Sequence, residues 1–124
     1  MAKRNEVIHA EIIADILTWI DINIFEPLKI NDVAEKSGYS KWHFQRVFYQ
    51  VTQSTLANYI RGRKLELAAW DLSNTNDDIS FISYKYGFDS QQSFTRIFSR
   101  KYNIPPLAYR KYHSSKPRPE DISI

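Results

Sequence analysis

A short pattern of aromatic and basic residues occurs twice in this chain, about 50 residues apart. Each copy opens with a glycine followed by an aromatic residue and continues, after a short polar stretch, with Phe-x-Arg-x-Phe. The glycines are Gly38 and Gly87, and the arginines are Arg46 and Arg96. Recurrence at a fixed offset indicates one structural unit used twice. A chain of 124 residues therefore folds as one domain or as two very small subdomains that share an element.

Each copy carries the requirements of a helix-turn-helix. That motif needs a small residue where its first helix touches its second, and a residue that tolerates positive φ in the turn four positions later. The first copy supplies Ala34 and Gly38, and the second supplies Ser83 and Gly87. Two such matches, each followed by the same Phe-x-Arg-x-Phe, predict two helix-turn-helix units.

Apolar periodicity places the helices. Isoleucine recurs every fourth position from Ile8 to Ile24, which predicts an amphipathic helix over residues 7–24. We expect Pro27 to end this helix, because proline cannot continue the backbone hydrogen bonds. Further helices are predicted over residues 31–37, 41–52, 55–72, 79–86, 90–102 and 105–112.

Several polar residues are predicted to cap these helices. The Ser40 hydroxyl can accept a free amide at the start of helix 41–52, and Ser54 can cap the longer helix that follows. Asp89 with Gln92 predicts a capping box for helix 90–102.

The helices 41–52 and 90–102, which carry the two Phe-x-Arg-x-Phe motifs, each show an apolar and a polar face. In helix 41–52 the spacing predicts a buried face of Phe44, Val47, Phe48 and Val51 and an outward face of Trp42, Gln45, Arg46 and Tyr49. In helix 90–102 the corresponding faces are Phe94, Ile97 and Phe98, and Gln92, Thr95, Arg96 and Ser99.

The sequence thus predicts an all-α fold of about seven helices, with two helix-turn-helix subdomains joined by a long connecting helix. The predicted boundaries are residues 7–53, 54–73 and 74–113, followed by a flexible tail over residues 114–124.

The charges are strongly partitioned along the chain. Residues 36–65 and 90–119 contain no acid, although both segments are rich in lysine and arginine; all 14 acids lie elsewhere. The net charge of +3 is modest, so this partition, more than the total, favours a polyanionic partner.

Other classes of protein lack support in the sequence. There is no cysteine, and His9, His43 and His113 lie far apart, so we expect no metal site and no cofactor. A nucleophile elbow and a phosphate-binding glycine loop are also missing, and we expect no enzyme. No apolar run approaches 18 residues and no signal peptide is recognisable, which predicts a cytoplasmic protein.

Several short stretches are distinctive in combination: Gly38-Tyr39-Ser40-Lys41-Trp42-His43, Tyr86-Gly87-Phe88, Ser90-Gln91-Gln92, Pro105-Pro106 and Tyr109-Arg110. Together they resemble the AraC/XylS family of bacterial transcription activators, in particular its compact branch with MarA, SoxS, Rob and RamA. The resemblance implies a monomer that binds DNA, activates multidrug and oxidative-stress resistance genes, and contacts RNA polymerase. Lys29 departs from it, since close relatives tend to have a capping serine there.

We expect six residues to contact base edges: Trp42, Gln45, Arg46, Gln91, Gln92 and Arg96. Arginine can grip guanine O6 and N7 with two hydrogen bonds, and glutamine can pair with adenine or bind through water. A thymine methyl or a sugar would cover the large apolar surface of Trp42. The alternatives are that Trp42 packs on the preceding helix, that the arginines meet only phosphate or solvent, and that the glutamines are merely solvated.

Seven further residues suit phosphate oxygens, which position a protein without specifying sequence. They are Lys41, His43, Arg61, Ser90, Ser93, Thr95 and Arg110, and any one of them could instead be an ordinary surface residue.

Two non-identical reading helices predict an asymmetric DNA site, read by a monomer in successive major grooves. The leading hypothesis is a transcription activator that recruits RNA polymerase at stress or multidrug-resistance promoters. The alternative is an architectural or repressing DNA-binding module without a polymerase contact. Since almost no chain lies outside the DNA-binding unit, we expect no small-molecule effector and control by the amount of protein.

Overall fold

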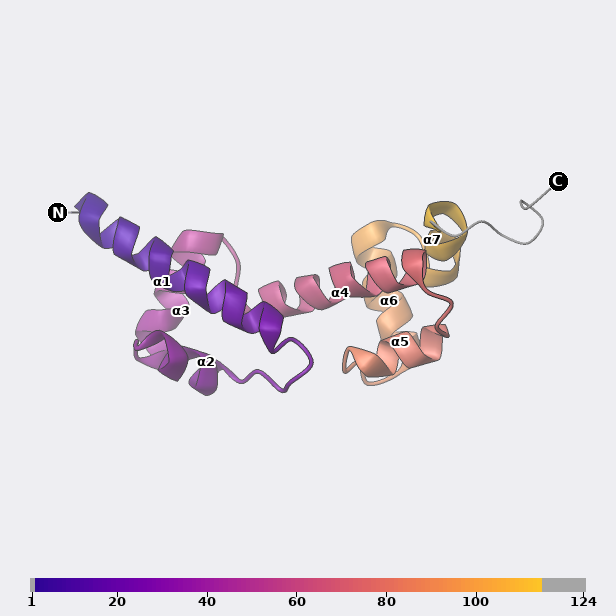
Figure 1. The fold of residues 1–124 in the computed structure, drawn as a ribbon, viewed down its shortest axis with the longest axis horizontal. Helices are drawn as coiled ribbons and strands as arrows, with labels where there is room; N and C mark the ends of the chain where they lie inside the picture. Colours follow the sequence, from indigo (N-terminus) through magenta and orange to yellow (C-terminus); the bar gives the residue numbers. More distant parts are fainter. Residues whose placement is uncertain (1, 115–124) are drawn as a thin grey trace. The chain divides into compact units, whose positions relative to one another are not determined.

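A computed structural model describes residues 2–114, and over this range it contains helices and no strand (Figure 1). The helices are α1 (Ala2–Ile22), α2 (Ile30–Ser37), α3 (Lys41–Thr52), α4 (Leu56–Asn74), α5 (Ile79–Lys85), α6 (Gln91–Tyr102) and α7 (Pro106–His113). The predicted all-α class with about seven helices is confirmed for the described residues. Apart from Ser114, the predicted tail lies outside them.

The chain divides into two compact units, and the division falls between Arg63 and Lys64, inside α4. The first unit combines α1, α2 and α3 with the beginning of α4, and the second combines the rest of α4 with α5, α6 and α7. The predicted connecting helix over residues 54–73 corresponds to α4, and the division between the two units falls inside it.

The core of the first unit forms where α1, α2 and α3 pack together. Ile13, Ile16 and Ile20 are buried along one stripe of α1, because positions three and four apart share a helix face. They lie in the same core as the buried rings of Phe44 and Phe48, whose centroids are 5.5 Å apart.

The core of the second unit is built the same way. Leu65 and Leu72 of α4 are buried with Ile82 of α5 and with Phe94 and Phe98 of α6. Partly buried rings of α6 and α7 extend this cluster, so α7 is an integral part of the unit.

The two helix-turn-helix turns have the backbone that the sequence predicts. Gly38 and Gly87 adopt the left-handed conformation, with φ of 84° and 76°. A side chain at this φ is strained, which explains glycine in both turns. The Ser40 hydroxyl accepts the His43 amide at 3.2 Å, as predicted for the cap of α3.

The recognition helices end alike. Gln53 after α3 and Asn103 after α6 also adopt left-handed φ, of 61° and 66°. Their amides bond back to Tyr49 and Ser99 and close the last turn of each helix.

Three predictions about helix ends are wrong. Pro27 does not end α1, which stops at Ile22. After it the bonds tighten from four-residue to three-residue spacing, because the Asn23 amide is shared with the Ile20 carbonyl at 3.1 Å and the Glu26 amide bonds to the Asn23 carbonyl at 2.9 Å. The cap of α4 is Thr55, whose hydroxyl accepts the Asn58 amide, while the Ser54 hydroxyl donates to the Thr55 carbonyl.

The third correction concerns α6. Its cap is Ser90, which accepts the Ser93 amide at 3.0 Å, in place of the predicted box of Asp89 and Gln92. A smaller difference concerns Val51, predicted on the buried face of α3 but 38% exposed in the last turn. Lys29 provides no side-chain cap to α2, as its departure from the family pattern implies.

Candidate nucleic-acid interface

Helix α3 presents an exposed polar face. Phe44, Val47 and Phe48 are buried on one face of the helix. The side chains on the other face are exposed: Trp42, Gln45, Arg46 and Tyr49. Trp42 is 71% exposed, which excludes the alternative that it packs on the preceding helix. No acidic residue occurs in α3, so the face carries only positive charge.

Arg46 and Trp42 lie against each other on this face. The guanidinium carbon Cζ of Arg46 is 4.9 Å from the centroid of the Trp42 ring. A cation above an indole face is attracted by the ring's negative quadrupole. The contact joins two of the predicted base-reading side chains one helical turn apart.

Helix α6 presents the matching face in the second unit. Phe94 and Phe98 are buried, and Gln91, Gln92 and Arg96 are exposed. These three side chains and the half-buried Thr95 line one open hollow, so the structure brings four of the predicted site residues together. Helix α6 also lacks acidic residues.

The start of α3 holds Lys41 and His43. Lys41 is exposed in the first turn. His43 is half-buried, with its ring 4.6 Å from the Tyr39 ring and 5.9 Å from the His9 ring of α1. The fold thus brings together two histidines that lie far apart in sequence. No group of three or more histidine, cysteine or acidic side chains able to hold a metal occurs among residues 2–114.

Of the remaining predicted phosphate contacts, Ser90 and Ser93 lie at the start of α6. Ser90 is exposed and caps the helix, while Ser93 is half-buried and donates its amide to that cap. A helix N-terminus with free amides favours phosphate. Arg61 is exposed on the part of α4 that belongs to the first unit.

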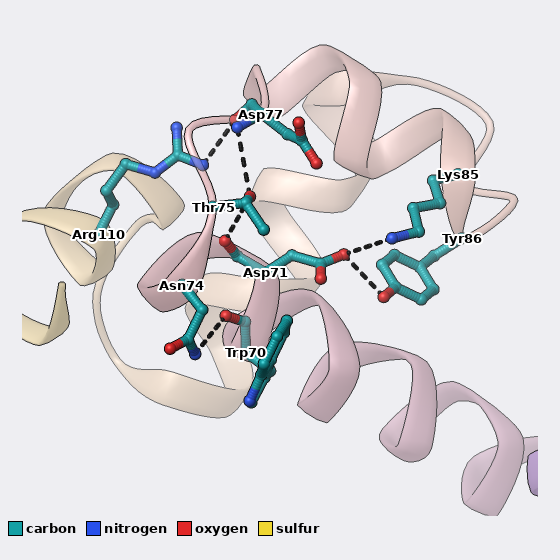
Figure 2. A network of polar contacts seen from close by, with 8 residues as sticks. All are labelled: Trp70, Asp71, Asn74, Thr75, Asp77, Lys85, Tyr86 and Arg110. Carbon is teal, nitrogen blue, oxygen red and sulfur yellow. Dashed lines mark hydrogen bonds and ion pairs between the residues drawn. The ribbon is translucent and has the colours of Figure 1, made fainter. Parts of the chain in front are cut away.

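Arg110 is already engaged within the second unit (Figure 2). Its Nε donates to the Leu72 carbonyl at 3.1 Å, and its Nη2 donates to the Asp77 carbonyl at 2.5 Å. The last carbonyls of a helix have no partner within it, and Arg110 supplies one near the end of α4. The side chain predicted to bind phosphate therefore fastens α7 to the α4–α5 connection.

A buried carboxylate, missed by the sequence reasoning, organises the second unit (Figure 2). Asp71 is 4% exposed, and its Oδ2 accepts the Tyr86 hydroxyl at 2.8 Å and the Lys85 ammonium at 3.0 Å. Burial, and then the bond to Asp71 and its charge, raise the pKa of Tyr86. The sequence feature that could have revealed this residue is the position of an acid next to Leu72 on the apolar side of α4.

Lys64 is a second residue that the site prediction left out. It is half-buried on α4, and its Nζ lies 3.8 Å from where a Cβ on Gly87 would be. Burial lowers the pKa of this lysine, because desolvation disfavours the charged form.

The helix-turn-helix domain family matches residues 33–112. The TetD protein of transposon Tn10 from Escherichia coli is 50% identical over 103 residues, which cover 83% of this chain and 75% of TetD. The regulatory protein SoxS of E. coli is 49% identical over 102 residues, covering 82% of this chain and 95% of SoxS. The multiple antibiotic resistance protein MarA of Salmonella typhimurium is 44% identical over 110 residues, covering 89% and 85%.

Solved structures agree on the fold. The xylose-binding transcription activator xylR matches with a TM-score of 0.78 and 26% identity over 85% of this chain, which spans only 28% of that protein. An AraC-type regulator from Chromobacterium violaceum matches with a TM-score of 0.76 and 24% identity over 92% of this chain and 96% of its own. The DNA-binding domain of AdpA, solved with a target DNA, matches with a TM-score of 0.73 and 21% identity over 80% and 89%. With two helix-turn-helix units and these relatives, the chain belongs to the AraC/XylS family of helix-turn-helix transcription regulators.

Proposed function

We propose that the protein is a sequence-specific transcription activator that reads an asymmetric DNA site as a monomer, with α3 and α6 in successive major grooves. The observation that carries this proposal is the pair of exposed, acid-free helix faces, each with an arginine at the same place beside a buried phenylalanine pair. The faces differ in their other side chains, which favours a site without two-fold symmetry.

The outward side chains of α3 and α6 are the base readers. Arg46 and Arg96 each take a guanine through O6 and N7, and Gln45, Gln91 and Gln92 meet adenine or bridging water. Trp42 covers a thymine methyl or a sugar. The exposure of all six in the free protein supports this assignment.

Phosphate contacts come from the helix starts and from α4. We assign them to Lys41, His43, Arg61, Ser90, Ser93 and Thr95. For Arg110 we propose a structural role instead, because its guanidinium is bonded to the Leu72 and Asp77 carbonyls. For the domain organisation we propose two helix-turn-helix modules that divide within α4.

The proposed regulatory role rests on the similarity to SoxS and MarA. Because the chain is about half identical to the regulatory protein SoxS and almost as similar to the multiple antibiotic resistance protein MarA, we propose that it acts in the cytoplasm at stress or multidrug-resistance promoters and contacts RNA polymerase there. In-vitro transcription with purified polymerase tests this. Activation from a bound promoter supports the proposal, whereas binding with repression alone favours an architectural or repressing module.

Selection from a randomised duplex library with the purified protein tests whether it recognises a specific, asymmetric base sequence. We expect one asymmetric site whose affinity falls by roughly 5- to 150-fold in Arg46→Ala, with relaxed preference at a few base pairs. Arg61→Ala should weaken all sequences alike and reduce the salt slope by about one. Lys3→Ala, which removes an exposed charge from α1, is the matched control and should leave base preference unchanged. A symmetric selected site would contradict the monomer.

A further inference from the structure

The contact between Trp42 and Arg46 leaves the N–H donors of the arginine without an acceptor among residues 2–114. The Cζ atom lies 4.9 Å from the ring centroid, and both side chains are exposed. A guanidinium carries five N–H donors, and the attraction of its charge to a ring does not require a hydrogen bond. The indole therefore restrains Arg46 without occupying the donors that a guanine edge would use.

No carboxylate competes for Arg46. Helix α3 has no acid, and within residues 2–114 no ion pair or hydrogen bond joins the Arg46 side chain to another residue. The contact with the Trp42 ring is thus the interaction that restrains this side chain in the free protein. An arginine side chain has high rotamer entropy, much of which is lost when it docks.

Helix α6 offers an internal comparison. The residue one turn before Arg96 is Gln92, which has no ring. Among the described residues, Arg96 has no cation–ring contact. The two arginines occupy equivalent places, yet only the one on α3 is held before DNA arrives.

We propose that Trp42 is a positioning residue, which restrains the Arg46 guanidinium on the exposed face of α3 so that base discrimination by Arg46 depends on the indole. This inference rests on the proposed DNA-reading role of α3. It assigns Trp42 a role through Arg46, beyond its own contact with the DNA.

A double-mutant cycle tests the inference. Affinities for the selected duplex are measured for the full chain, Trp42→Ala, Arg46→Ala and the double variant, each with every base pair at the position that Arg46 reads. If Trp42 acts through Arg46, Trp42→Ala lowers affinity by roughly 2- to 30-fold and relaxes preference at that base pair. In the Arg46→Ala background, Trp42→Ala then changes the preference at that base pair by less than about twofold, while the affinity from the direct contact of Trp42 with DNA is still lost.

Two further measurements separate positioning from a general effect. In the free protein, the NMR signals of the Arg46 side chain should show ring-current shifts that disappear in Trp42→Ala and return in Trp42→Phe, which should also restore part of the base preference. As the matched control, the cycle of Gln92→Ala with Arg96→Ala should be additive within about twofold.

The outcomes are distinct for the two ideas. If Arg46→Ala changes neither affinity nor base preference, the proposed reading role of α3 fails. If Arg46→Ala has its expected effect, but Trp42→Ala leaves the preference at that base pair unchanged and loses the same affinity with and without Arg46, the reading role stands and the positioning role is overturned. Absence of ring-current shifts on Arg46 also overturns it.

Discussion

Replacing Asp71 by alanine should destabilise the second unit selectively. The substitution removes the acceptor that the Tyr86 hydroxyl and the Lys85 ammonium share (Figure 2). Since Asp71 and Tyr86 are both 4% exposed, water cannot readily replace the lost partner. The substitution therefore weakens the packing of α4 against α5.

The size of this effect follows from the two bonds. A hydrogen bond to a charged acceptor contributes about 1.5–3 kcal/mol, and burial of the Tyr86 pair justifies the full range. The Lys85 side chain is 32% exposed, so its pair adds only about 0–1 kcal/mol. We expect Asp71→Ala to lower the free energy of unfolding of this unit by about 1.5–4 kcal/mol.

Native-state amide hydrogen exchange measures the loss unit by unit, through the opening free energies of the Ile82 and Phe94 amides. Asp71→Asn keeps an acceptor for Tyr86 and should lose about half as much. Glu66→Ala is the control, because its 3.7 Å pair with Lys101 is largely exposed and contributes about 0–1 kcal/mol. A loss below about 1 kcal/mol in Asp71→Ala, or an equal loss in the control, would refute the reasoning.

Arg110→Ala should lower the free energy of unfolding by about 1–3 kcal/mol in urea, because two backbone carbonyls lose their donor, while the exposed Lys111→Ala changes it by less than about 0.5 kcal/mol. The dependence of DNA affinity on salt concentration should keep the same slope in Arg110→Ala. A slope smaller by about one would show that Arg110 does contact a phosphate. Because the folded protein raises the pKa of Tyr86, the stabilisation is complete below the unfolded tyrosine pKa of about 10 and is lost as pH rises above it. Tyr86→Phe should flatten this alkaline decline, and an unchanged pH profile would contradict the cause. Gly38→Ala should cost about 1–2 kcal/mol in thermal unfolding from backbone strain alone, since a Cβ there meets no atom within 4 Å; an unchanged melting temperature would show that the turn relaxes.

The sequence predicted those parts of the fold that depend on local spacing. The all-α class, the limits of α3 and the turns at Gly38 and Gly87 followed from helical periodicity and from the steric freedom of glycine. The orientation of both recognition faces followed for the same reason, because the side that buries Phe44 or Phe94 fixes the side that faces solvent. Which of these side chains contact DNA stays a prediction.

What the sequence could not supply is the choice among competing partners. Thr55 and Ser54 both have hydroxyls near the start of α4, and only the backbone geometry decides which one caps it. Arg110 looked like any cation in a basic segment until α7 packed beside the end of α4. The acceptor role of Asp71 likewise depends on α5, which brings Tyr86 to it from 15 positions along the chain.

The ends of α3 and α6 have a consequence for protein engineering. Gln53 and Asn103 carry side chains in a conformation that costs an ordinary residue about 1–2 kcal/mol and glycine almost nothing. Both lie one full helix length from the caps at Ser40 and Ser90. Substituting glycine at Gln53 should therefore raise the melting temperature, and because this position lies outside the outward face proposed to read bases, we expect stability to change without a change in base preference.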